Sequence, residues 1–341
     1  QFGDEMSAPL IFLDPHPRTQ EMVYTPECAE ALARMGRVVA HWGSRAPGDL
    51  VEAHLGDMAV LVGQTDMPAE RLARAPKLRA ILNVKANWEP NIDYAGCAAR
   101  GIHVLSAAPA MAPAVAEFCL GQAIALLRGL PAANTAFRAG REEYGIAGNR
   151  KARSLYGAEV ALIGYGNLGR ALAPLLRPFG VRLRVYDPWL SEGYLRAEGL
   201  EPVSLETALS GSDVLFLLAG VTDENEGALD RSRLGTVRPD ASVILASRAE
   251  IVDFDAFVDL ASQGAFRAAI DVFPEEPVPS DASLRSAPDI LFSAHLAGGL
   301  EASYARIRAM MLDDIAQILR GLPPGRMQRA EPALAARMRS R

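Results

Sequence analysis

The sequence has few of the features that mark disulfide-bonded or metal-binding proteins. It contains only three cysteines, Cys28, Cys97 and Cys119, and none is paired at a metal-ligand spacing. An odd, small number of cysteines in 341 residues favours reduced thiols and the cytoplasm over a disulfide framework. Cys119 lies in an apolar run, which favours packing over a role as a lone catalytic thiol. No metal site is expected.

Charge and hydrophobic runs exclude further classes. The chain has 35 basic and 41 acidic side chains, a formal net charge of -6, with the two signs intermixed. Without a broad basic surface, neither nucleic acid nor acidic lipid is an expected partner. The apolar runs read as far shorter than the about 20 residues of a membrane span, and no signal-peptide pattern opens the chain. We therefore expect a cytoplasmic protein with no membrane contact.

The alternation of apolar runs and helical patterns predicts an α/β protein. A chain of this length exceeds one ordinary core, so two domains are expected. Apolar strands joined by helices indicate parallel sheets covered on both faces, which predicts two doubly wound parallel-sheet domains. The expected strands are 10–13, 38–41, 59–62, 80–84 and 103–105, then 159–163, 183–186, 214–218, 243–246, 268–272 and 290–292. One long or kinked helix at 110–137 separates the two sets, and a last helix is expected at 300–319.

A glycine-rich turn provides the sharpest single motif. An apolar strand runs into Gly164-x-Gly166-x-x-Gly169, and an apolar helix follows. In a dinucleotide site the first glycine permits the tight turn, the second lets the backbone approach a pyrophosphate, and the third lets helix and strand pack closely. Asp187 ends the next predicted strand, 18 residues after Gly169, near the usual place of a ribose-binding carboxylate. A carboxylate there repels a 2′-phosphate, so NAD is favoured over NADP.

Three later segments follow this turn in a specific order: 246–253 around Arg248, 271–277 around Glu276, and 293–299 around His295. With the glycine-rich turn, they make the chain resemble the D-isomer-specific 2-hydroxyacid dehydrogenases, which include D-lactate, glycerate and 3-phosphoglycerate dehydrogenases. The resemblance implies that Arg248 binds the substrate, that His295 is the acid/base, and that Glu276, or its neighbour Glu275, is the catalytic glutamate. The chemistry agrees, because arginine matches a carboxylate, histidine titrates near neutrality, and a nearby carboxylate favours the imidazolium.

The resemblance also implies an organisation and a cofactor site. A Rossmann-type NAD-binding domain at 110–298 would be inserted into a discontinuous, flavodoxin-like substrate-binding domain at 1–109 and 299–341. Asn167 and Leu168 would contact the pyrophosphate, Ala246 and Ser247 would line the cofactor site, and Asp271 would approach the nicotinamide. The segment 128–144 would pair two subunits, so a homodimer is expected.

One loop departs from the family's pattern. Ala86 and Trp88 stand where the family has glycines, in a loop whose backbone amides bind the substrate carboxylate, and Lys85 adds a cation. Lys85, Ala86 and Arg248 are thus the expected substrate-binding residues. The expected activity is NAD(H)-dependent interconversion of a small 2-oxo acid and its D-2-hydroxy acid. One alternative is the same chemistry on a phosphorylated or phosphonate 2-oxo acid held by Lys85. Another is an NAD-sensing scaffold or corepressor on the same fold.

Overall fold

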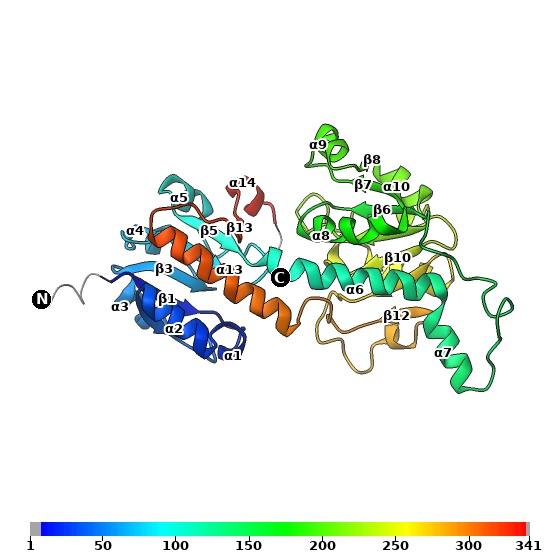
Figure 1. Ribbon diagram of the computed structural model, residues 1–341, viewed down its shortest axis with the longest axis horizontal. Coiled ribbons are helices and arrows are strands. Elements are labelled where there is room, and N and C mark those ends of the chain that lie inside the picture. Colours follow the sequence, from blue (N-terminus) through cyan, green and yellow to red (C-terminus); the bar gives the residue numbers. More distant parts are fainter. Residues whose placement is uncertain (1–7, 339–341) are drawn as a thin grey trace, which may run out of the picture. The chain divides into compact units, whose positions relative to one another are not determined.

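The computed structural model describes residues 8–338 of the chain. These residues divide into two compact units, one formed by residues 8–111 and 299–338 and the other by residues 112–298 (Figure 1). The first break lies at 111/112, two residues after the expected 109/110, and the second lies at 298/299.

The first unit contains a six-stranded sheet in the order β13-β5-β4-β3-β1-β2. The five predicted strands are present and parallel, and their order is that of flavodoxin-like sheets. The sixth strand, β13, pairs antiparallel with β5 and was not predicted, because two residues are too few to form an apolar pattern. The bounds are β1 (Leu10–Asp14), β2 (Arg37–Ala40), β3 (Met58–Gly63), β4 (Ala80–Asn83), β5 (His103–Ser106) and β13 (Gln328–Arg329).

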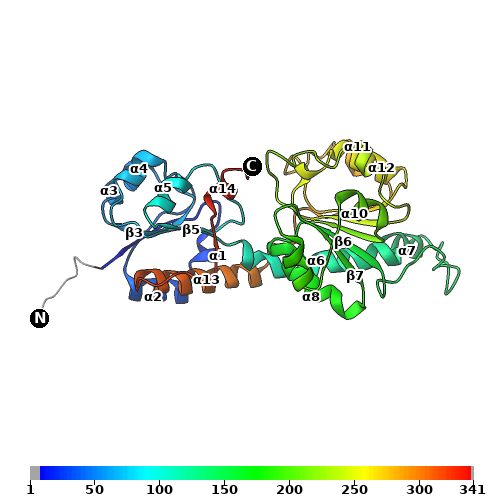
Figure 2. The same cartoon turned by 90° about the horizontal axis from the view of Figure 1, so that it is seen from above.

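Helices cover both faces of this sheet (Figure 2). Helices α1, α2 and α13 pack on one face, around Leu32, Ile307 and Ile315. Helices α3, α4, α5 and α14 lie on the other, around Val51 and Leu72. The bounds are α1 (Gln20–Val23), α2 (Pro26–Met35), α3 (Gly48–His54), α4 (Ala69–Ala73), α5 (Tyr94–Ala99), α13 (Glu301–Leu319) and α14 (Pro332–Ala335).

The second unit contains a seven-stranded parallel sheet in the order β12-β11-β10-β9-β6-β7-β8. Counted from β6, this is the Rossmann order with a seventh strand at one edge. The six predicted strands are present, and the two-residue β8 was missed. The bounds are β6 (Glu159–Ile163), β7 (Arg182–Tyr186), β8 (Glu201–Pro202), β9 (Val214–Leu217), β10 (Ser242–Leu245), β11 (Arg267–Ile270) and β12 (Ile290–Phe292). The predicted fold class is confirmed.

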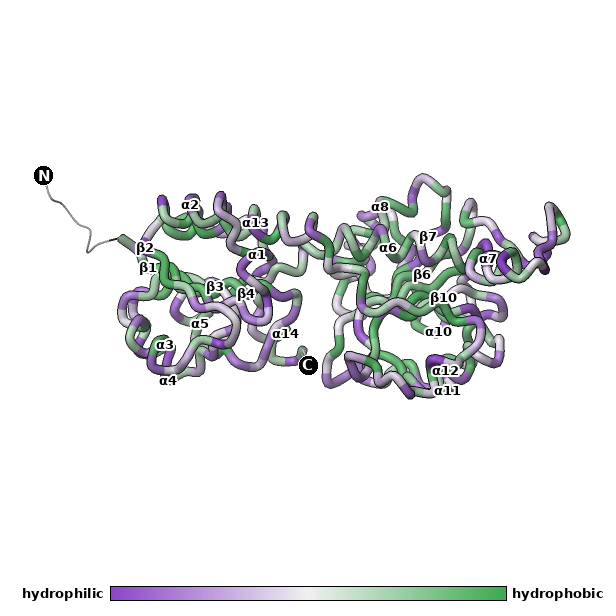
Figure 3. The backbone as a smooth tube through the Cα atoms, turned by 90° about the horizontal axis from the view of Figure 1, so that it is seen from below, coloured by the Kyte–Doolittle hydropathy of each residue, from purple (hydrophilic) through white to green (hydrophobic). Residues whose placement is uncertain are grey.

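The helices of the second unit again form two layers, with hydrophobic strands between them (Figure 3). Helices α6 and α8 pack on one face, and α10, α11 and α12 pack on the other. The bounds are α6 (Ala108–Arg128), α7 (Leu130–Arg138), α8 (Asn167–Leu176), α9 (Glu192–Ala197), α10 (Leu205–Gly211), α11 (Arg231–Leu234) and α12 (Phe254–Ser262).

Helix α6 bears on two expectations. The long or kinked helix expected at 110–137 is divided at Gly129, whose φ is 61°, into α6 and α7. The expectation that no apolar stretch approaches the length of a membrane span was wrong, because α6 has 21 residues and a mean hydropathy of 1.6. Interspersed alanine, glycine and proline hid this length in the sequence. However, 56% of its apolar window is buried, and Cys119 and Ala123 lie inside the core of the second unit. We therefore assign α6 as a core helix.

Candidate active site

The glycine-rich turn joins β6 to α8, and each glycine has its own steric reason. A Cβ on Gly164, where φ is 99°, would lie 2.8 Å from the Cα of Ala219. A Cβ on Gly169 would lie 2.8 Å from the carbonyl oxygen of Gly164. Gly166 is exposed, and a Cβ there would meet nothing within 4 Å. The turn therefore presents open backbone at Gly166, directly before Asn167 and Leu168 in the first turn of α8, where a phosphate is stabilised.

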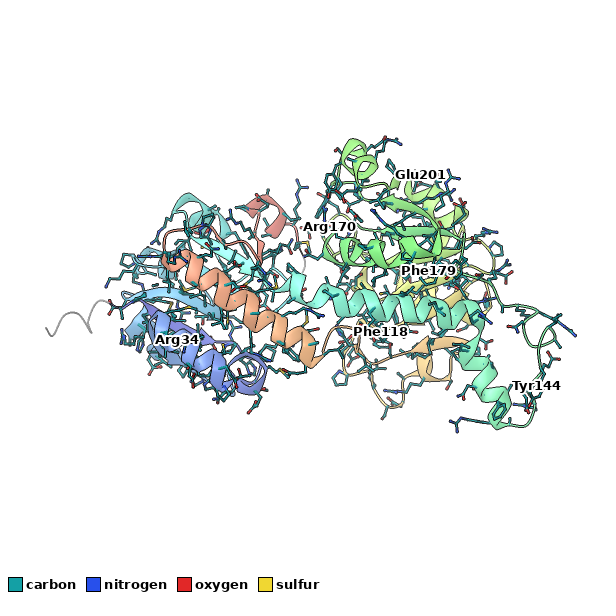
Figure 4. All side chains as sticks on the ribbon, viewed as in Figure 1. Arg34, Phe118, Tyr144, Arg170, Phe179 and Glu201 are labelled. Carbon is teal, nitrogen blue, oxygen red and sulfur yellow. The ribbon has the colours of Figure 1, made fainter. Side chains whose placement is uncertain are left out.

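Asp187, directly after β7, is tied to this turn. Its Oδ2 accepts a hydrogen bond from the N–H of Tyr165 at 2.8 Å, and its Oδ1 accepts one from Trp189 at 3.0 Å. Arg170 on α8 lies between the rings of Tyr165 and Tyr194, 5.0 and 5.1 Å from their centroids (Figure 4). These contacts hold the glycine-rich turn, the Asp187 carboxylate and the start of α8 next to one another. Their arrangement fits the phosphates and ribose of a dinucleotide.

Arg248 lies just beyond β10, at the carboxyl edge of the same sheet. Burial lowers the pKa of its guanidinium, while the carboxylates of Glu250 and Glu276 act in the opposite direction. Because arginine stays protonated in proteins, it presents a half-buried cation. One of its N–H groups donates to the carbonyl of Ser247 at 2.6 Å. Ser247 and Ala246 are buried, and the Ser247 hydroxyl donates to the carbonyl of Leu217, which links β10 to β9.

His295 and Glu276 meet at this edge from two different loops. The His295 Nδ1 lies 2.7 Å from Oε2 of Glu276, so Glu276, and not Glu275, contacts the imidazole. The other oxygen of Glu276 accepts the N–H of Phe273 at 3.0 Å, which fixes the carboxylate. The His295 side chain is 51% exposed, and its Nε2 makes no hydrogen bond within residues 8–338. A carboxylate on Nδ1 leaves Nε2 as the nitrogen that can exchange a proton with a ligand.

Asp271, after β11, holds the loop that carries His295. Its carboxylate is 2% exposed and accepts hydrogen bonds from the Ser293 hydroxyl at 2.6 Å and from the N–H groups of Leu296 and Ala297 at 2.9 and 3.1 Å. Its carbonyl accepts the N–H of His295 at 2.8 Å. His295 has a φ of 52°, which is unusual for a residue other than glycine. The contacts of the Asp271 carboxylate are therefore with the loop that carries His295, and a contact with the nicotinamide stays a prediction.

In the first unit, the loop after β4 is shaped by a buried amide. Asn83 Oδ1 accepts hydrogen bonds from the Gln64 side chain at 2.6 Å and from the N–H of Lys85 at 2.7 Å. Its Nδ2 donates to the carbonyl of Asn87 at 2.6 Å. Trp88, which replaces a family glycine, is buried edge-on against Tyr94 at 6.2 Å. The loop keeps a defined turn without the glycines because the Asn83 side chain replaces main-chain turn contacts.

The same loop shows what Lys85 and Ala86 can offer a ligand. Lys85 Nζ lies 2.5 Å from Glu89 Oε1, so its charge already has a carboxylate partner. The N–H of Lys85 is taken by Asn83. Ala86 is exposed at the tip, and its N–H donates to no described residue. The amide of Ala86 is therefore available to a ligand.

Sequence reasoning missed Asn83, Gln64, Glu89 and Ser293 as parts of these sites. Glu89 could have been found, because it lies four residues after Lys85. The contact between Gln64 and Asn83 and that between Ser293 and Asp271 join residues 19 and 22 positions apart in the chain, which no local pattern reveals. All three cysteines are buried, and burial raises the pKa of Cys119 to about 12, which agrees with packing. Within the part of the chain that the structure describes, no group of three or more metal-ligating side chains gathers.

Comparisons with known proteins decide the family. Residues 120–297 match the model of the D-isomer specific 2-hydroxyacid dehydrogenase NAD-binding domain, just over half of the chain. The chain belongs to the D-isomer specific 2-hydroxyacid dehydrogenase family. The predicted family and the predicted nicotinamide cofactor are thereby confirmed.

Named relatives of this family differ in their substrates. The crystal structure of a phosphoglycerate oxidoreductase from Rhizobium etli is 40% identical, with a TM-score of 0.85, over 95% of this chain and 98% of that one. A glyoxylate reductase from Korarchaeum cryptofilum is 27% identical over 83% of this chain and 87% of its own length. A D-3-phosphoglycerate dehydrogenase from Mycobacterium bovis is 29% identical over 74% of this chain, which spans about half (47%) of that relative's length.

Proposed function

We propose that this dehydrogenase uses NAD(H) to interconvert a small 2-oxo acid and its D-2-hydroxy acid, with His295 as the acid/base. The observation that carries the proposal is the 2.7 Å contact between His295 and Glu276, beside a half-buried Arg248 at the same sheet edge. This set supplies what the reaction needs, namely a cation for the carboxylate and a proton donor for the carbonyl oxygen.

Each residue has a separate role in this proposal. Arg248 binds the substrate carboxylate and orients the carbonyl, because its planar guanidinium matches a carboxylate. His295 gives a proton from Nε2 to the carbonyl oxygen during reduction and takes it back during oxidation, while Glu276 stabilises the imidazolium through Nδ1. The nicotinamide, when bound, supplies or accepts the hydride. We assign the Asp187 carboxylate, which is hydrogen-bonded to the glycine-rich turn, to the ribose hydroxyls of the adenosine; there it would repel a 2′-phosphate and so favour NAD.

In the first unit, we assign the Ala86 N–H and the cation of Lys85 to the substrate-binding region, and residues 8–111 and 299–338 to a substrate-binding role. A phosphorylated 2-oxo acid is the second candidate substrate, favoured by the name of the 40% identical phosphoglycerate oxidoreductase. The Lys85–Glu89 pair favours the first candidate, because it leaves no uncompensated charge on the loop.

A cytoplasmic homodimer is part of the proposal. Helix α7 has no buried residue, and it and the segment after it expose Phe137, Tyr144 and Ile146, the last with 91% of its surface. Exposed apolar patches of this kind mark protein interfaces. A second copy of the chain, docked through residues 128–146, would cover them.

The deciding experiment is NADH oxidation against a panel of 2-oxo acids, including glyoxylate, pyruvate, hydroxypyruvate and its phosphate. Turnover of at least one acid, lost in His295→Ala while NADH still binds, supports the proposal. NADH binding without turnover of any acid would instead favour an NAD-sensing scaffold or corepressor. The ratio of kcat/KM for hydroxypyruvate to that for its phosphate separates the two candidate substrates.

A further inference from the structure

The loop from Asn83 to Glu89 carries an ion pair that the family resemblance does not assign. Lys85 Nζ and Glu89 Oε1 are 2.5 Å apart, and their side chains are 30% and 17% exposed, so the acid is the more buried partner. A pair at this depth is screened less by water than an exposed surface pair.

The backbone under both residues is fixed, so the pair is held in place. Asn83 fixes Lys85 by accepting its N–H at 2.7 Å. The carbonyl of Lys85 accepts the N–H of Ala107 at 3.1 Å. The carbonyl of Glu89 accepts the Tyr94 hydroxyl at 2.7 Å, beside the buried Trp88. Little further ordering is needed to form the ion pair, which is therefore preorganised.

We propose that Glu89 is a specificity-determining residue that masks Lys85 and disfavours 2-oxo acids with a second anionic group; this inference rests on the proposed function. The loop follows β4 at the carboxyl edge of a parallel sheet, where such sheets bind ligands. An anionic substituent that reaches Lys85 there meets a carboxylate 2.5 Å from the ammonium, and must break the pair or accept like-charge repulsion. A neutral substituent meets no such penalty.

Another cation on this edge is compensated in the same way. Arg45 lies 2.7 Å from Asp66, which also accepts a hydrogen bond from Asn91 near the same loop. A second anionic group would thus find paired cations at both Lys85 and Arg45. Glu89 is the simplest residue to substitute, because removing its carboxylate leaves the Lys85 ammonium without its partner and keeps the Asn83 contacts of the loop intact.

The test compares Glu89→Gln with the wild type on matched 2-oxo acids, namely 2-oxobutanoate with oxaloacetate, and hydroxypyruvate with its phosphate. The dianion-to-monoanion ratio of kcat/KM should rise on the order of 10- to 100-fold in Glu89→Gln, because an unmasked, partly buried ammonium then binds the second anion. Lys85→Met alone should leave the ratio unchanged or lower it, because the Glu89 carboxylate then lacks its cation and repels a second anion. The double variant should return to the wild-type ratio.

The control is Glu30→Gln, which removes the same charge from an i,i+4 pair with Arg34 on the exposed face of α2 (Arg34 is labelled in Figure 4) and should leave the ratio unchanged. An unchanged ratio in an active Glu89→Gln variant overturns the inference and leaves the proposed function standing. The inference also fails if the rise persists in the double variant, or if Lys85→Met alone raises the ratio. Absence of turnover with every acid in the wild type rejects the proposed function itself, and this inference with it.

Discussion

The sharpest prediction concerns Asp271, for which two roles compete. The structure shows its carboxylate accepting three hydrogen bonds from the loop that carries His295, whereas the family resemblance places it near the nicotinamide. Asp271→Asn separates them. The oxygen of the asparagine amide can still accept hydrogen bonds from two of the three donors. Its NH2 group, however, then lies opposite the third donor, such as the N–H of Ala297, and that donor is left without an acceptor. An unpaired buried donor costs about 1–3 kcal/mol.

This loss is large enough to release His295. Its left-handed backbone, with φ at 52°, costs roughly 1–2 kcal/mol, which the Asp271 contacts now offset. Weakening them by about 2 kcal/mol shifts the loop equilibrium by roughly 10- to 30-fold toward conformers with negative φ, which carry the imidazole away from Glu276. We therefore expect kcat to fall by about that factor, while the Kd for NADH stays within about threefold of the wild type.

The assay pairs steady-state kinetics with fluorescence titration of NADH. Asp253→Asn is the matched control, because Asp253 caps α12 with a single hydrogen bond to the N–H of Ala256 that an asparagine can also make. Ser293→Ala, which removes one donor and leaves the two backbone contacts, should cost only a few-fold in kcat. A Kd for NADH raised tenfold or more with kcat unchanged would refute the reasoning and place Asp271 against the cofactor.

Four further predictions follow from these sites and from the exposed segment at and after α7. NADH should be preferred to NADPH, and Asp187→Ala should narrow the gap in kcat/KM; equal efficiency with NADPH in the wild type would contradict the assigned role of this carboxylate. His295→Ala should lower kcat by on the order of 10²–10⁴ with NADH affinity nearly intact, and unchanged turnover would mean that another group donates the proton. Glu276→Gln should keep some activity but alter the pH dependence of kcat, because an amide cannot stabilise the imidazolium; a superimposable profile would contradict this. Ile146→Asp combined with Phe137→Asp should shift the elution volume in size-exclusion chromatography from dimer to monomer, and an unchanged dimer would exclude this surface as the interface.

The parts of the fold that the sequence predicted are those with strong local patterns. Buried parallel strands are near-continuous apolar runs, so β3, β6 and β9 were recognisable from a few residues each. The missed strands, β8 and β13, have two residues each, and only tertiary pairing defines them. The position of the break between α6 and α7 at Gly129 could not be predicted either. A glycine within a helical pattern can have helical or left-handed backbone angles, and the sequence does not show which.

The site residues follow the same division. The motif around Gly164, and the order of Arg248, Glu276 and His295, can be read directly from the sequence. The contacts that position them cannot, because Asp271 reaches its donors across 22 to 26 residues and Asn83 reaches Gln64 across 19. Local patterns therefore locate the chemical groups, and only the fold shows what holds them.

The two acids on the segment after β11 show why this distinction matters for mechanism. Asp271 and Glu276 lie five residues apart, and the family resemblance assigned the catalytic role to Glu276, or its neighbour Glu275, and a place near the nicotinamide to Asp271. Asp271 is buried, and its carboxylate accepts hydrogen bonds from three donors of the loop that carries His295. These contacts suit a residue that holds this loop in one conformation. Glu276 is partly exposed and has one backbone donor and the imidazole, so its interaction changes when the ring gains or loses a proton. Because only a contact that changes during proton transfer can favour one protonation state, we propose that Glu276 acts on the chemistry of His295 and that Asp271 acts on its position.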